Sequence, residues 1–221
     1  MGLKGARVLA EALQSHGSRM EQLLFDGGEL GDDGTVLLSE ALGATSLHTL
    51  VLWDNNIGPK GSTAIAEALR HTDLTTIELA NNNVGNPGAK ALAGALASSQ
   101  VQTIGLNRNS IRNKGAKALA EALAASQVHT LRLSHNQIGD SGMKALSAAI
   151  AAPGGRVLTT LDIAHNQVGD SGIRALAKAI GNSGLNKLVV SGNAIGAQAK
   201  AELTQAWQQK HANRGGTGLL L

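Results

Sequence analysis

The chain has 221 residues with one Phe, two Trp, no Tyr and no Cys, so it suits a single domain or repeat array with an aliphatic core. Without cysteine it cannot form disulfides, a thiolate zinc site or a cysteine nucleophile. A formal net charge of +3 is too small for a dedicated nucleic-acid binder, and no run of about 18 apolar residues could span a membrane. We therefore expect neither a nucleic-acid nor a membrane partner.

The first predicted element is a helix over residues 5–14. Its sequence GARVLAEAL places apolar residues at helical spacing. Closely similar helix patterns of the form GxxALAxAL recur at residues 61–69, 88–96, 115–123 and 142–150. Because a strand motif precedes each later copy but not the first, we expect the chain to begin with a half-repeat.

A strand motif of the form LxxLxLxxNxI alternates with these helices. Most copies are 27 residues apart, and the single longer spacing of 30 residues falls where Pro153 marks a loop. In the first copy Gly28 stands in place of the asparagine. Seven strands are therefore predicted. The copies begin at Met20, Leu47, Leu74, Val101, Val128, Leu158 and Leu185.

Helix starts are marked by a column of Asp and Asn residues. Their side chains can accept hydrogen bonds from the free amides of a helical first turn, so we predict that they are helix caps. The column consists of Asp32, Asn86, Asn113, Asp140 and Asp170.

The repeat resembles the leucine-rich repeat family over about residues 5–203. Its helix-bearing unit is similar to the ribonuclease inhibitor type, which Ran GTPase-activating proteins and the repeat domains of NOD-like receptors share. The resemblance implies an α/β solenoid, a horseshoe with a concave parallel β-sheet and convex α-helices. We expect one leucine-rich repeat domain over residues 1–221, with a C-terminal tail at residues 211–221. The tail either marks a piece cut from a longer array or folds over the last repeat with Trp207.

The asparagine of the strand motif resembles the family's asparagine ladder, in which the side-chain amide bonds backbone groups of the turn and of the neighbouring coil. An unsatisfied turn there would cost about 1 to 3 kcal/mol per buried polar group. These asparagines are therefore predicted to be structural. They are Asn55, Asn82, Asn109, Asn136, Asn166 and Asn193.

Residues between and just after the strand leucines are predicted to face the concave surface, because side chains alternate along a strand. Trp53 with Leu24 and Val51 would form an apolar patch of the kind that marks a contact site. Acidic residues surround this patch and basic ones follow. Two other interpretations stay open, in which Trp53 only covers the weak first repeat and Arg132 pairs with Asp162. The candidate protein-binding residues are Leu24, Asp26, Val51, Trp53, Asp54, Glu78, Arg108, Arg132, His135, Asp162 and His165.

Catalytic and metal motifs are absent from the sequence. GxSxG, the phosphate-binding loop and HExxH do not occur, and the repeated GDSG falls at helix starts. His135 and His165 occupy equivalent positions, but two histidines without a third strong ligand do not predict a metal site. We expect no catalytic residue, no metal and no cofactor.

The leading hypothesis is a protein–protein interaction module that binds a protein partner on its concave face. One alternative is a regulator of a small GTPase, similar to Ran GTPase-activating proteins, although their acidic tail is missing. Another is a structural segment of a larger repeat receptor or effector. Ribonuclease inhibition ranks last, because a net charge of +3 would steer a basic ribonuclease poorly. We expect a cytoplasmic monomer, or alternatively a bacterial effector delivered to the host cytosol.

Overall fold

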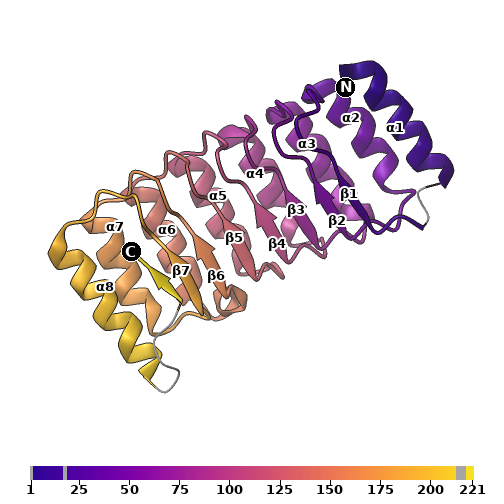
Figure 1. Cartoon of the computed structure of the whole chain (residues 1–221). Helices are drawn as coiled ribbons and strands as arrows, with labels where there is room; N and C mark the ends of the chain where they lie inside the picture. Colours follow the sequence, from indigo (N-terminus) through magenta and orange to yellow (C-terminus); the bar gives the residue numbers. More distant parts are fainter. Residues whose placement is uncertain (1, 17–18, 213–217) are drawn as a thin grey trace.

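The computed structural model describes residues 2–16, 19–212 and 218–221, in which eight α-helices alternate with eight strands (Figure 1). The helices are α1 (Gly2–His16), α2 (Gly31–Leu42), α3 (Pro59–Ala68), α4 (Gly85–Leu96), α5 (Asn113–Leu123), α6 (Asp140–Ala151), α7 (Asp170–Ile180) and α8 (Ala197–Lys210). The strands are β1 (Gln22–Leu24), β2 (Thr49–Val51), β3 (Thr76–Glu78), β4 (Thr103–Gly105), β5 (Thr130–Arg132), β6 (Thr160–Asp162), β7 (Lys187–Val189) and β8 (Leu219–Leu220). Short 3₁₀ turns lie at Leu69–His71 and Pro153–Val157.

The strands form one parallel sheet in sequence order, and the helices form a layer on one side of it (Figure 1). Neighbouring strands pair in a register of one repeat, as in Leu23 with Leu50 and Leu50 with Ile77. Strands in a sheet lie about 4.8 Å apart, whereas packed helices need about 8 to 10 Å. The sheet therefore lines the concave side, and the predicted α/β solenoid is confirmed.

The apolar positions of the repeat form one continuous core between the two layers. In the second repeat, Leu50, Leu52 and Ile57 are all fully buried. A lone repeat would leave these side chains open to solvent on both flanks. They become buried only because adjacent repeats stack.

The prediction of seven strands was wrong, because the C-terminal tail adds β8. The amide of Leu188 donates to the carbonyl of Gly218, and that of Val190 donates to Leu220. Trp207 is buried beneath this end, with its ring centroid 4.3 Å from that of His211. The tail thus folds over the last repeat with Trp207, while residues 213–217 of the predicted tail lie outside the described residues.

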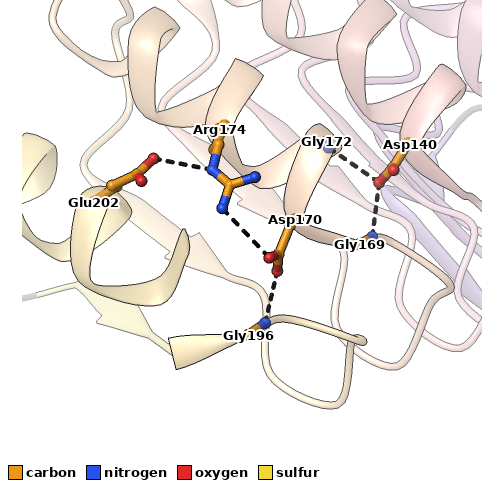
Figure 2. A network of polar contacts seen from close by, with 7 residues as sticks. All are labelled: Asp140, Gly169, Asp170, Gly172, Arg174, Gly196 and Glu202. Atoms are coloured by element: carbon orange, nitrogen blue, oxygen red, sulfur yellow. Dashed lines mark hydrogen bonds and ion pairs between the residues drawn. The ribbon is translucent and has the colours of Figure 1, made fainter. Parts of the chain in front are cut away.

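The column of predicted helix caps acts between repeats. None of these side chains caps its own helix. Instead, Asn113 Oδ1 accepts hydrogen bonds from the amides of Gly139 and Gly142, at 2.8 and 2.9 Å, at the start of the next helix. Asp140 binds the amides of Gly169 and Gly172 in the same way (Figure 2). The predicted capping chemistry is present, but it joins each repeat to the one that follows.

Two helices follow a repeat that lacks such an acceptor, and their starts differ from the others. Leu3 and Pro59 occupy the acceptor position before α2 and α4. These helices begin at Gly31 and Gly85, whose φ angles of 62° and 60° are left-handed. Glycine adopts this conformation without the steric cost that a side chain would add. A glycine turn therefore replaces the acceptor where the column is interrupted.

Candidate protein-binding face

The asparagine ladder fixes the turn that follows each strand. Asn109 Nδ2 donates to the carbonyls of Leu79 and Asn107, and its Oδ1 accepts from the amide of Val84. The other members of the column make equivalent bonds. For example, Asn55 Oδ1 accepts a hydrogen bond from the amide of Gly28 at 3.1 Å. Because each side chain binds backbone groups in its own repeat and in the preceding one, the concave surface is built on a rigid support.

Trp53 and Leu24 form the exposed apolar patch at the N-terminal end of the sheet. Trp53 is 43% exposed and Leu24 is 66% exposed. Trp53 lies two residues beyond Val51, the strand partner of Leu24, so the two side chains are diagonal neighbours on one face. The third predicted member, Val51, is only 8% exposed and belongs to the sheet surface beneath the patch.

Acidic side chains border this apolar patch. Asp26 and Asp54 are both exposed. Asp26 follows β1 at the position that corresponds to Trp53 in the next repeat, and the amide of Gly27 donates to the Trp53 carbonyl at 3.1 Å. Asp54 accepts a hydrogen bond from Asn81 at 2.9 Å. An apolar surface with a negative rim is thus presented at one end of the sheet.

In the middle of the sheet, Glu78 pairs with Arg132 and not with a group on the neighbouring strand. The pair spans β4, where Gly105 has no side chain. A Cβ at Gly105 would lie 1.7 Å from Glu78 Oε2, so only glycine leaves room for the carboxylate. Asp162, the partner expected for Arg132, instead accepts a hydrogen bond from the amide of Ala164 at 3.0 Å. The hypothesis of an Arg132–Asp162 pair was therefore wrong.

The Glu78 side chain is nearly buried, while that of Arg132 is 41% exposed. Burial raises the pKa of the Glu78 carboxyl above its ordinary value, and the charge of Arg132 opposes this rise. Since the two charges neutralise each other, Arg132 is not a free cation on the concave face.

The turn position after each strand requires a left-handed backbone. The φ angles of Asp54, Arg108, His135 and His165 lie between 52° and 55°. Asn, Asp, His and Gly tolerate this conformation better than other residues do. The composition of this column, which contains the candidate protein-binding residues Asp54, Arg108, His135 and His165, is thus in large part a backbone requirement. The whole column is Gly27, Asp54, Asn81, Arg108, His135, His165 and Gly192.

His135 and His165 lie together in this column. Their ring centroids are 4.2 Å apart and the rings are nearly parallel, with 12° between their planes. In the described residues, no group of three His, Asp or Glu side chains is placed to hold a metal ion.

None of the helices in the described part of the chain has the length and apolar character that a membrane crossing requires.

Comparison with known proteins agrees with this geometry. A family profile described as leucine-rich repeat matches residues 43–66, 70–93, 127–147 and 156–177. Comparison with curated protein sequences gives no significant match.

Two solved structures share the fold. The actin-binding site 2 of leiomodin-1 aligns with a TM-score of 0.56 and 18% identity, covering 70% of this chain and 90% of that one. An internalin from Listeria monocytogenes aligns with a TM-score of 0.51 and 22% identity, covering 78% of this chain and 42% of that one. These similarities establish the fold, while the ribonuclease inhibitor subtype stays a prediction.

Proposed function

Since the chain is a leucine-rich repeat protein, we propose that it binds another protein through the concave face of its sheet. Solenoids of this kind present an extended concave surface on a rigid support, and such surfaces are used for binding. The leiomodin-1 segment, an actin-binding site, is an example of this fold in a protein-binding role. The proposal concerns binding and not catalysis.

The observation that carries the proposal is the exposure of Trp53. The other tryptophan, Trp207, is 1% exposed and belongs to the core. Tryptophan is enriched among residues that dominate binding energy, because a large rigid ring buries much area at little entropic cost. With Leu24 beside it and Asp26 and Asp54 at its rim, the patch suits a partner that places an apolar side chain between basic ones.

The experiment is capture of partners from a lysate of the source cell with the wild-type chain and with Trp53→Ala. Lys117→Ala is the matched control, because Lys117 is well exposed on α5, away from the sheet. Both variants must first show the wild-type melting temperature. A true partner should be retained by the wild type and by Lys117→Ala, and bound at least about tenfold more weakly by Trp53→Ala. Equal retention by all three chains would place binding elsewhere and overturn the proposal.

Two other functions stay predictions. Regulation of a small GTPase has no specific support in the described geometry, and a GTP hydrolysis assay with a panel of small GTPases would reveal it. A role as a segment of a larger receptor or effector is compatible with the internalin match, which spans 42% of that protein. The cytoplasmic location and the monomeric state are likewise predictions.

A further inference from the structure

Three neighbouring repeats carry a positive or proton-binding side chain at the same turn position. Arg108, His135 and His165 follow β4, β5 and β6 respectively, and all three are exposed. They lie over the middle of the sheet, beside the Glu78–Arg132 pair, whereas the patch of Trp53 and Leu24 lies at the β1–β2 end. We call these three residues the cationic turn cluster.

Arg108 is an outlier within the turn column. Its φ angle of 54° is left-handed, a conformation that favours Gly, Asn, Asp and His and is unfavourable for a long side chain. Within the described part of the chain, the Arg108 guanidinium makes no hydrogen bond or ion pair. The left-handed backbone of Arg108 therefore costs energy that no side-chain contact among the described residues offsets. Such strain is a reason to look for a function at this residue.

The two histidines form a fixed pair next to Arg108. Their rings stack at 4.2 Å, and a Cβ at Gly192 would lie 2.4 Å from His165 Nδ1. The glycine at position 192 therefore leaves the space that the His165 ring uses. Both residues are exposed, so the stacked pair lies at the protein surface where β5 and β6 end.

The charge of this cluster depends on pH. Burial lowers the pKa of His135 below its ordinary value, with further lowering by Arg108 and His165, while Asp162 opposes these effects. The lowered pKa keeps the His135 imidazole neutral at pH 7.5, where Arg108 supplies positive charge, and acidification toward pH 5.5 adds charge as His135 begins to take up a proton. Asp162, the acid that acts on His135, already accepts a hydrogen bond from the amide of Ala164.

We propose that Arg108, His135 and His165 form a docking site for an acidic segment of the protein partner, and that this site binds more tightly as the pH falls. The inference rests on the proposed function and deepens it, because it assigns a charge to the part of the partner that lies over the middle of the sheet and not over Trp53. A carboxylate of the partner would pair with Arg108, which has no acidic partner among the described residues. At low pH, charge-assisted hydrogen bonds from imidazolium to the same segment would strengthen binding.

The test measures binding of a hexaglutamate peptide, with neutral hexaglutamine as the probe control, at pH 7.5 and pH 5.5 in low salt. Glutamate stays largely ionised at both pH values. The wild type should bind hexaglutamate about two- to fivefold more tightly at pH 5.5, as expected for added charge at an exposed site. The double variant His135→Asn/His165→Asn should lose this pH dependence, because Asn accepts the left-handed turn without titrating. Arg108→Asn should bind more weakly at both pH values.

Lys114→Gln is the matched control, since it removes one exposed positive charge from α5 and should leave binding at the cluster unchanged. Melting temperatures of all variants exclude loss of the fold as a cause. A pH dependence that persists in the double histidine variant, or equal binding of hexaglutamate and hexaglutamine, would overturn the proposal. The assay needs no knowledge of the partner and does not involve Trp53, so its failure is distinguishable from failure of the proposed function.

Discussion

At the scale of single residues, the charge pattern of the concave face depends on Gly105. The Glu78 carboxylate reaches Arg132 across β4 only because no side chain stands at position 105. We predict that Gly105→Ala lowers the free energy of unfolding by about 1 to 2 kcal/mol, since the displaced carboxylate loses its charged partner. In a Glu78→Ala background the same substitution should be close to neutral. Denaturant unfolding of the four chains in this cycle measures both values.

Gly94→Ala is the control for the loss of a glycine. Gly94 is exposed on α4, and an added Cβ there would meet no atom within 4 Å, so alanine should stabilise the helix by about 0.5 to 1 kcal/mol. An equal cost of Gly105→Ala in both Glu78 backgrounds would contradict the prediction, because the clash would then involve something other than the carboxylate.

The surroundings of Gly105 also show a contact that the sequence could not predict. Strand register predicts which side chains are neighbours, and on that basis Arg132 was expected to pair with Asp162 on the next strand. The observed pair joins strands two apart, because two long side chains can meet over a glycine. Register describes Cα positions, so it could not reveal which rotamers would bring Arg132 to Glu78.

At the scale of elements, the starts of α3, α5, α6, α7 and α8 are each stabilised by an acceptor in the repeat before. We predict that Asn113→Ala costs about 1 to 2 kcal/mol, as loss of a helix cap does, because the amides of Gly139 and Gly142 lose their acceptor. Hydrogen exchange at Gly142, in α6, should become faster. The amide of Gly115, in α5 itself, is bound by Asn86 and should keep its protection.

Lys114→Ala, at the neighbouring position in α5, is the control and should leave exchange at Gly142 unchanged. Faster exchange at Gly115 with no change at Gly142 would instead show that Asn113 caps its own helix.

The elements themselves were predictable, whereas their mutual connections were only partly so. Leucine spacing predicted the strands, the helices and the buried positions, because burial of a repeated motif follows its period. The capping column was predicted by residue type, but its partners are 26 to 32 residues away along the chain. The tail was left open, because three leucines after a glycine-rich stretch carry no repeat motif and their pairing with β7 depends on the tertiary structure.

At the scale of the whole molecule, β8 pairs with β7 and the side chain of Trp207 in α8 is buried beside it. In a solenoid each unit contacts only its neighbours, so the effect of removing one end should remain local. We predict that deletion of residues 213–221 speeds hydrogen exchange at Leu188 and Val190, whose amides donate to Gly218 and Leu220. Exchange in β4 should stay unchanged, because three strands lie between β4 and β8.

Leu220→Glu is the matched control for this deletion, because the Leu220 side chain is 54% exposed while its carbonyl accepts the amide of Val190. It should preserve the protection of Leu188 and Val190. Faster exchange across the whole array after deletion would contradict the prediction and show that the repeats unfold as one unit. If the effect stays local, the truncated chain should keep its hexaglutamate binding at Arg108, since the cationic turn cluster belongs to repeats that the tail does not contact.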